Sequence, residues 1–214
     1  MAISGKGIVR KNDRGLQEIP NSHPEVNMKV TKTIAGLGLA LGLLAGTPGK
    51  SWGLIAILNV PLYAQQTGNT CWAACDQMVR AYFSDYVSQC SIVNFGLKRS
   101  DCCLYPNSVY CNQPHWSSLL DMPWAYFTYT ASYPLPFAGV KQEISYYGRP
   151  LLAGFAFAGG GGHMRVVSGV SDEGGQWLLH NDPLPANSGS YIWIAYSQWS
   201  ANVNKTYFNI YRQD

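Results

Sequence analysis

The sequence predicts an α+β domain in which a helical first part packs on an antiparallel β-sheet formed by the second part. Three observations lead to this fold class. Apolar side chains follow a helical spacing after residue 69, short apolar segments typical of strands follow one another after residue 151, and glycine-containing turns separate them. With 214 residues, of which 47% are hydrophobic and 13% charged, the chain can bury one sizeable core.

The charge balance argues against one class of partner. Fifteen basic residues and twelve acidic residues give a formal net charge of +3. The basic residues form neither a long run nor a stripe interleaved with aromatic residues, which a nucleic-acid-binding surface would need. We therefore expect no nucleic-acid partner.

The first 57 residues differ in composition from the rest of the chain. Residues 1–27 are polar and aperiodic, which predicts a disordered leader or a start site assigned too early. In residues 28–57, two lysines precede an apolar run of 13 residues at 34–46, which is too short to span a bilayer but has the length of a signal-peptide core. A pro-segment or a buried helix is the alternative.

The signal-peptide interpretation has consequences for the rest of the chain. Met28 would be the true start, and the mature chain would begin between Thr47 and Leu58. We then expect a secreted or periplasmic protein with no stable membrane span in its mature form. Its folded domain would be residues 58–214.

Residues 59–83, NVPLYAQQTGNTCWAACDQMVRAYF, predict a short strand, a polar loop and an amphipathic helix in that order. The apolar face of this helix comprises Trp72, Cys75, Val79 and Tyr82. Asn69 or Thr70 can cap the helix, so Cys71 lies in its first turn. Unpaired backbone N–H groups and the positive end of the helix dipole favour a thiolate there, which is the reactive form of a nucleophilic cysteine.

Gln65 stands six residues before Cys71, in a loop that can fold back toward the start of the helix. Its side-chain amide could donate to the oxygen of a tetrahedral intermediate, beside the backbone N–H of Cys71. Gln66 is the alternative if the loop is shifted by one residue. Taken singly, Cys71 could be a buried helical cysteine and Gln65 a solvated loop residue.

The arrangement Q-x5-C-W-A, which runs from Gln65 to Ala73, resembles the signature around the nucleophile of papain-like cysteine peptidases. It is especially similar to the bacterial members, which include secreted effector proteases and the peptidase domains that process bacteriocin leaders. This resemblance implies that Cys71 is the nucleophile and that Gln65 contributes to the oxyanion hole.

Five cysteines remain beside Cys71, so at least one is unpaired within the chain. Cys75 lies one helical turn after Cys71 and is predicted to be a small buried residue. The other four lie in a loop-rich stretch that predicts two disulfides: Cys90, Cys102, Cys103 and Cys111. Their spacing leaves the pairing open, although a bridge between the neighbours Cys102 and Cys103 would be strained. A zinc site formed by these four and His115 is the alternative, and the absence of a Cys-x-x-Cys spacing disfavours it.

The second half of the chain predicts one short helix and then strands. Residues 138–147 have a helical pattern that ends at Gly148 and Pro150. The strands are expected near residues 151–158, 163–170, 176–180, 190–195 and 206–211.

His163 is the histidine best placed to act as the base that Cys71 needs. It opens a strand, HMRVVSGV, directly after a run of glycines that removes bulk beside it. The pattern G-H-x-x-V-V-x-G-V resembles the histidine strand of the papain-like fold. His23 lies in the polar leader, His115 lies in a loop rich in Pro and Asn, and His180 ends an apolar segment whose facing is ambiguous.

The third member of a triad would accept a hydrogen bond from the second ring nitrogen of His163. Residues 163–180 predict a hairpin, so the end of its second strand returns to His163 and brings Asn181 and Asp182 close. The resemblance favours Asp182, because bacterial members have an Asp-Pro here. An Asx-turn before Pro183 is the alternative for Asp182.

Together, the resemblance implies a papain-like fold and a cysteine endopeptidase with a Cys-His-Asp triad. We expect protein or peptide substrates, a monomer, and neither a cofactor nor a metal. Two alternatives stay open. One is a cysteine amidase or acyl-transfer enzyme on the same scaffold, and the other is an inactive secreted binding module. Such a module would use an aromatic surface formed by Trp116, Trp124, Tyr126 and Tyr129.

Overall fold

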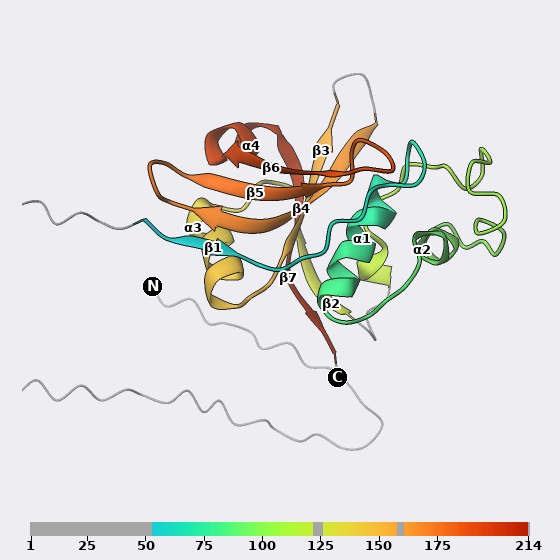
Figure 1. The fold of residues 1–214 in the computed structure, drawn as a ribbon, viewed down its shortest axis with the longest axis horizontal. Coiled ribbons are helices and arrows are strands. Elements are labelled where there is room, and N and C mark those ends of the chain that lie inside the picture. Colours follow the sequence, from blue (N-terminus) through green and yellow to red (C-terminus); the bar gives the residue numbers. More distant parts are fainter. Residues whose placement is uncertain (1–52, 122–125, 158–160, 214) are drawn as a thin grey trace, which may run out of the picture. The chain divides into compact units, whose positions relative to one another are not determined.

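The computed structural model describes residues 53–121, 126–157 and 161–213 (Figure 1). These residues belong to one compact unit, Gly49–Asp214. The predicted leader 1–27 and all but the last residues of the predicted segment 28–57 lie outside the described residues, as does Trp124. No helix in the described ranges combines the length and the apolar character needed to cross a membrane.

Helices dominate the described chain up to residue 121, and strands dominate from residue 126 onward. The helical elements are α1 (Cys71–Tyr82), α2 (Gln89–Gly96), the 3-10 turn η1 (Ser118–Asp121), α3 (Phe137–Lys141), the π-helical turn η2 (Gln142–Tyr146) and α4 (Tyr196–Asn202). The strands are β1 (Ile55–Ile57), β2 (Tyr126–Ala131), β3 (Leu151–Ala156), β4 (Gly162–Ser171), β5 (Trp177–Asp182), β6 (Ser190–Ala195) and β7 (Val203–Arg212).

Within the described residues, seven strands form one antiparallel sheet. Six of them follow the order β2-β7-β3-β4-β5-β6, and β1 pairs with β4 beyond the end of β3. In Figure 1, α1 and α2 lie together on one side of the view, and β4, β5 and β6 lie on the other. The predicted α+β fold class, with a helical part packed on an antiparallel sheet, is confirmed.

The alternation of side chains along β3 and β4 divides the core between the two faces of the sheet. On one face, Leu152 and Val166 pack with α1 and α2. On the opposite face, Leu151 and Val167 pack with α3, η2 and α4. The sheet is thus covered on both sides in its centre, and the start of α1 lies beside the strand that carries His163.

Some elements differ from the expectation. The strand expected at the start of residues 59–83 lies earlier, at Ile55–Ile57, because those residues pair with the exposed end of β4. The helix expected at 138–147 divides into α3 and the π-helical η2. Strand β2 was not predicted, and it pairs with β7 at the edge of the sheet. Strand β7 lies about eighty residues away in the sequence, so no local pattern indicates that the two strands pair.

Candidate active site

Helix α1 begins at Cys71, and the side chain of this residue is partly exposed. Thr70 occupies the N-cap position, but its hydroxyl does not cap the helix. Instead it contacts Thr67, whose Oγ1 lies 2.9 Å away and whose carbonyl lies 3.2 Å away. The expected side-chain cap is therefore absent. The Thr70 hydroxyl accepts no hydrogen bond from the backbone N–H groups in the first turn of α1, where Cys71 lies.

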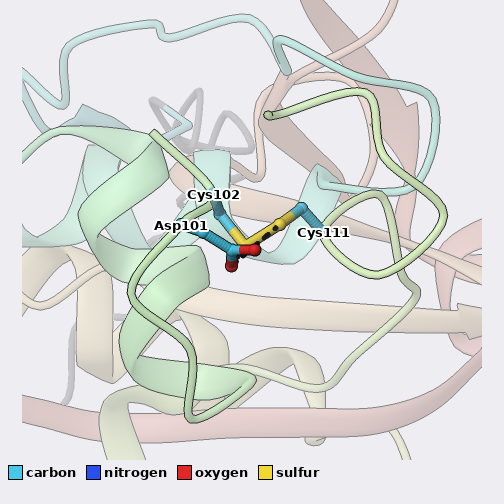
Figure 2. A group of neighbouring side chains, drawn as sticks. All are labelled: Asp101, Cys102 and Cys111. Carbon is cyan, nitrogen blue, oxygen red and sulfur yellow. Dashed lines mark hydrogen bonds between the residues drawn. A yellow bond between two sulfur atoms is a disulfide. The ribbon is translucent and has the colours of Figure 1, made fainter. Parts of the chain in front are cut away.

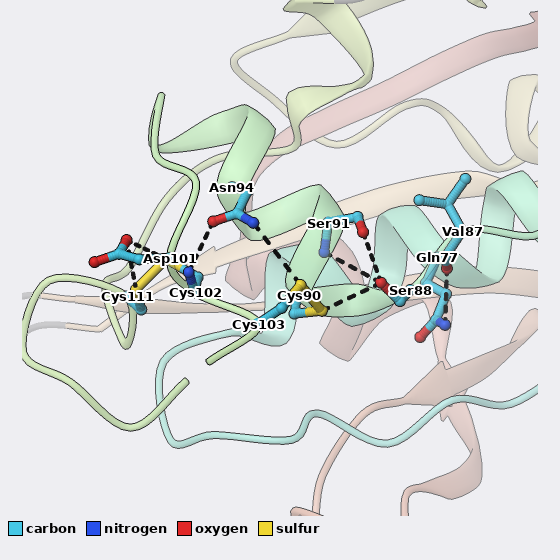
Figure 3. Close-up of a disulfide and its surroundings, with 10 residues drawn as sticks. All are labelled: Gln77, Val87, Ser88, Cys90, Ser91, Asn94, Asp101, Cys102, Cys103 and Cys111. Atoms are coloured by element: carbon cyan, nitrogen blue, oxygen red, sulfur yellow. Dashed lines mark hydrogen bonds between the residues drawn. A yellow bond between two sulfur atoms is a disulfide. The ribbon is translucent and has the colours of Figure 1, made fainter. Parts of the chain in front are cut away.

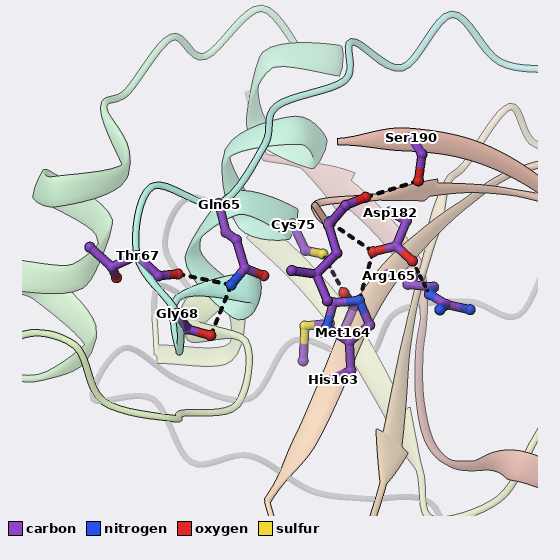
Figure 4. Close-up of polar contacts among 10 residues, drawn as sticks. Gln65, Thr67, Gly68, Cys75, His163, Met164, Arg165, Asp182 and Ser190 are labelled. Carbon is purple, nitrogen blue, oxygen red and sulfur yellow. Dashed lines mark hydrogen bonds and ion pairs between the residues drawn. The ribbon is translucent and has the colours of Figure 1, made fainter. Parts of the chain in front are cut away.

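Gln65 is buried in the loop before α1, with 1% of its surface exposed. Its Nε2 donates to the carbonyl oxygens of Thr67, at 2.8 Å, and of Gly68, at 2.9 Å (Figure 4). Its Oε1 is buried without a hydrogen-bond partner among the described residues. In this state the amide holds the loop together, and it can donate to an oxyanion only by releasing one of these carbonyls. The neighbouring Gln66 is exposed and contacts Gln89 through its backbone N–H.

His163 is the second residue of β4 and is 8% exposed. Gly162 precedes it, and a Cβ at that position would come within 2.5 Å of the carbonyl oxygen of Phe155 on β3. Only glycine permits this close approach of the two strands, as the sequence indicated. The approach fixes the position of His163 at the start of its strand.

Asp182 ends β5 and lies against His163. Asp182 Oδ1 is 2.7 Å from His163 Nε2 (Figure 4), which leaves the other ring nitrogen, Nδ1, for Cys71. Asn181 takes part in a different contact, because its Nδ2 donates to the carbonyl oxygen of Val60 and its Oδ1 accepts from Ser168. Of the two candidates, the structure brings Asp182 and not Asn181 to the histidine.

The electrostatics of this pair favour two opposite charges. Burial lowers the pKa of His163, but hydrogen bonds to Asp182 and Cys71 and the charges of both partners outweigh it and raise the pKa to about 9. Burial raises the pKa of Asp182, yet the hydrogen bonds from His163 and from the Leu184 N–H, together with the charges of His163 and Arg165, leave it below its ordinary value. At neutral pH the pair is an imidazolium and a carboxylate.

Arg165 also belongs to this site, and the sequence patterns did not single it out. Its Nε lies 2.6 Å from Asp182 Oδ2 (Figure 4). One signal was available in the sequence. Arg165 follows His163 by two residues on the same strand, so the two side chains share a face.

A cleft of about 650 Å³ lies in front of Cys71 and His163. Its other walls include Gln65, His115, Trp116 and Phe157, so these aromatic residues line the same cleft as Cys71. Gly154 allows Trp116 to pack on β3, because a Cβ there would lie 2.6 Å from the indole ring. His115, which the sequence places in a loop rich in Pro and Asn, lines the cleft, and its ring centroid is 4.9 Å from that of Trp72.

The three described residues of the aromatic binding surface that we expected, Trp116, Tyr126 and Tyr129, do not form one patch. Tyr126 is buried in the core, whereas Tyr129 is half exposed on β2 and stacks on Phe208. Trp116 lines the cleft. Tyr126 therefore belongs to the core, and Trp116 belongs to the wall of the cleft.

The cysteine cluster contains the two predicted disulfides. Cys90 pairs with Cys103, and Cys102 pairs with Cys111, with S–S distances of 2.11 and 2.08 Å (Figure 3). Cys75 is free and fully buried, as predicted.

The geometry also bears on the zinc alternative. Among the described residues, Asp101, Cys102 and Cys111 form the one group whose ligand atoms lie close enough to hold a metal (Figure 2). The two sulfurs are bonded to each other, so neither is a thiolate that could bind zinc. His115 lies on the cleft and is not part of this group.

Comparison with known proteins gives one family. The model of the family described as papain-like cysteine protease AvrRpt2 matches residues 55–198. No curated protein matches the sequence significantly.

Comparison with solved structures also gives peptidases. The peptidase domain of Streptococcus ComA, described as a bi-functional ABC transporter involved in a quorum sensing pathway, is 12% identical, with a TM-score of 0.50 over 72% of this chain and 99% of that domain. A double glycine motif protease from an AMS/PCAT transporter, solved in complex with a leader peptide, is 19% identical, with a TM-score of 0.47 over 72% of this chain and 92% of that one.

Proposed function

This chain belongs to the papain-like cysteine protease AvrRpt2 family, and from that premise we propose that it hydrolyses peptide bonds with a Cys71-His163-Asp182 triad and an oxyanion hole that includes Gln65. The chain is a papain-like cysteine peptidase of the bacterial type, with a papain-like α+β fold. The assignment of the individual residues is our proposal. The observation that carries it is the buried contact of 2.7 Å between His163 and Asp182, at a cleft that Cys71 also lines.

In the proposed reaction, the Cys71 sulfur attacks the carbonyl carbon of the substrate and a tetrahedral intermediate forms. Backbone N–H groups at the start of α1, and the Gln65 amide once it releases a carbonyl, donate to the oxyanion. His163 then protonates the leaving amine, and the acyl-enzyme forms. Water, deprotonated by His163, attacks the acyl-enzyme and releases the carboxylic acid, which restores Cys71. Asp182 holds the imidazolium in the orientation that both proton transfers require.

We further propose that the protein is secreted or periplasmic and acts as a monomer on protein or peptide substrates. The two disulfides support an oxidising compartment. Removal of a signal peptide would leave β1 intact if cleavage falls before Ile55. The intact mass of the exported protein would locate the cleavage point, and a mature chain that begins outside the range from Thr47 to Leu58 would contradict the expected boundary.

The catalytic assignment can be tested with two matched cysteine variants. Cys71→Ala should abolish hydrolysis of denatured casein and labelling by iodoacetamide at neutral pH. Cys75→Ala removes the other free thiol, which is buried one helical turn further on. This variant should still hydrolyse casein and should still be labelled by iodoacetamide. An active Cys71→Ala protein would reject the triad. Release of fragments from peptidoglycan, with casein left intact, would favour the amidase instead.

A further inference from the structure

Arg165 and His163 approach the same carboxylate from the same strand. The side chain of Arg165 is 24% exposed and that of Asp182 is 4% exposed, so their ion pair of 2.6 Å is largely shielded from water. The Arg165 guanidinium lies 5.1 Å from the ring centroid of Phe155 on the neighbouring strand β3. Phe155 is the residue that pairs with His163 across the two strands. Arg165 is therefore held by the same part of the sheet that holds the proposed base.

The contacts of Asp182 use both of its oxygens. Oδ1 lies 2.7 Å from His163 Nε2 and accepts from the Leu184 N–H at 2.9 Å, while Oδ2 faces Arg165 (Figure 4). A carboxylate held only through Oδ1 could rotate about its Cβ–Cγ bond. A cation on Oδ2 opposes that rotation, because turning the carboxylate would break the ion pair.

The charges around Asp182 make Arg165 important for a second reason. The groups on other elements that interact with Asp182 are His163 and Arg165 on β4 and Cys75 on α1, and Cys71 on α1 interacts with His163. Its neighbour on β5 is His180, which burial and then the charge of Arg165 keep neutral, with a pKa lowered to about 3. Burial also raises the pKa of Cys75, which therefore stays a thiol. The positive charge of Arg165 thus compensates the negative charge of Asp182 when a Cys71 thiolate compensates the positive charge of His163.

We propose that Arg165 is a positioning residue for peptide hydrolysis, which fixes the plane of the Asp182 carboxylate so that Oδ1 faces His163. This inference rests on the proposed function. Arg165 contacts neither the scissile bond nor Cys71 in this scheme and acts only through Asp182. Its removal leaves the three triad residues in place but loosens the contact that orients the imidazolium.

The experiment is an NMR titration of the His163 ring in the full chain, compared among the wild type, Arg165→Gln and Arg165→Lys. Arg165 could act only through its charge, or it could position the Asp182 carboxylate. These two roles predict opposite shifts of the His163 pKa when Arg165 is replaced. Loss of a nearby positive charge alone would raise the pKa of His163. Loss of the positioned carboxylate lowers it, because the hydrogen bond to Asp182 is the largest contribution that raises it. We expect a downward shift of about one pH unit in Arg165→Gln.

Arg165→Lys retains the charge and should recover part of the shift. Arg99→Gln is the matched control, because Arg99 forms an ion pair of 2.6 Å with Asp101 away from the cleft, and its loss should leave the titration unchanged. In steady-state kinetics, kcat of Arg165→Gln should fall about tenfold with little change in KM, because the contact between His163 and Asp182 matters in the proton-transfer steps.

An unmoved or upward-shifted titration in a folded Arg165→Gln protein would overturn the proposal, even if its thermal stability had fallen. If Arg165→Gln does not fold, the titration of Arg165→Lys decides, and a value equal to that of the wild type together with an unchanged kcat overturns it. These outcomes differ from failure of the proposed function. An active Cys71→Ala protein rejects the triad, whereas an inactive one combined with an unmoved titration rejects only the role of Arg165.

Discussion

Asn69 donates two hydrogen bonds to Asn112, which lies 43 residues later in the sequence. The Asn69 N–H donates to Asn112 Oδ1 at 2.8 Å, and Asn69 Nδ2 donates to the Asn112 carbonyl at 3.0 Å. The next residue, Gln113, accepts from the indole of Trp72 at 3.1 Å. The segment that follows Cys111 therefore supports both the loop before Cys71 and the first turn of α1.

This contact predicts different effects for the two disulfides. Cys102→Ser combined with Cys111→Ser should reduce kcat/KM several-fold, because Asn112 directly follows the bond that is lost. Cys90→Ser combined with Cys103→Ser should leave kcat/KM of the folded enzyme nearly unchanged. Each double variant should lose roughly 2–4 kcal/mol in the free energy of unfolding. Urea unfolding and kinetics at a temperature where both variants are folded would test this, and equal losses of activity would contradict it.

The pH dependence of hydrolysis provides a second prediction. In the proposed reaction His163 must be protonated to release the leaving amine, and its pKa in the folded protein is raised to about 9. The alkaline limb of kcat/KM should therefore have its midpoint near pH 9. A limb near the ordinary histidine pKa of about 6.5 would mean that His163 is not held by Asp182.

The same shift affects stability with a definite sign. Because the folded pKa of His163 lies above the unfolded value, its charged contacts stabilise the fold fully below about pH 6.5, and this contribution disappears as the pH rises toward 9. The difference in unfolding free energy between the wild type and His163→Ala should shrink between those values. Urea unfolding at pH 6 and at pH 9.5 would measure it.

The part of the site that could be predicted from the sequence is the part with local patterns. The helical face around Trp72 and Cys75 and the strand opened by His163 each occupy one continuous segment, so spacing alone places them. The partner of His163 required a long-range step, from the expected hairpin to Asp182 at its far end. The contact between Arg165 and Asp182 was not predicted, because the position of Arg165 two residues after His163 indicates a shared face of the strand but not its partner.

Prediction from the sequence has the same limit in the loops. His115 and Trp116 line the cleft, but their segment has no periodicity, and its position depends on the disulfide pairing that the spacing left open. The resting contacts of Gln65 could not be foreseen either, because they go to backbone carbonyls whose direction depends on the turn at Thr67 and Gly68.

Gln65 and Gln66 form a natural pair of variants for the oxyanion hole. Gln65→Ala removes the proposed donor and should reduce kcat about 100-fold with a smaller change in KM. Gln66→Ala should leave kcat nearly unchanged, because the described contact of Gln66 is made by its backbone. Gln65→Glu keeps the shape of the side chain but cannot donate when it is ionised, so it should be as defective as Gln65→Ala. Equal activities of the Gln65 and Gln66 variants would remove Gln65 from the mechanism.

The roles of Asp182 and Asn181 can also be distinguished with a matched pair of variants. Asp182→Ala should reduce kcat/KM by about two orders of magnitude or more, because the His163 imidazolium loses its partner. Asn181→Ala should mainly destabilise the fold, by about 1–3 kcal/mol, since the carbonyl of Val60 and the hydroxyl of Ser168 lose buried hydrogen bonds. Kinetics corrected for the fraction of folded protein would distinguish these effects. A greater catalytic loss in Asn181→Ala would reverse the assignment.

Asp76 on α1 provides a test of stability that is independent of catalysis. Its carboxylate is fully buried and accepts from Ser117 Oγ at 2.5 Å, from the Ser118 N–H at 2.7 Å and from Ser118 Oγ at 2.8 Å. Burial outweighs these hydrogen bonds and raises the pKa of Asp76 to about 6.

Because the folded pKa of Asp76 exceeds the unfolded value of about 3.9, the folded state binds the extra proton, and this group's contribution to stability is lost as the pH rises from about 4 to 6. The loss amounts to about 3 kcal/mol for a shift of this size. Asp76→Asn keeps a carbonyl oxygen for Ser118 but cannot titrate. Its free energy of unfolding should therefore fall less than that of the wild type between pH 4 and pH 7 in urea titrations. Parallel curves for the two proteins over that range would show that Asp76 has an ordinary pKa, and that the contacts with Ser117 and Ser118 compensate fully for its burial.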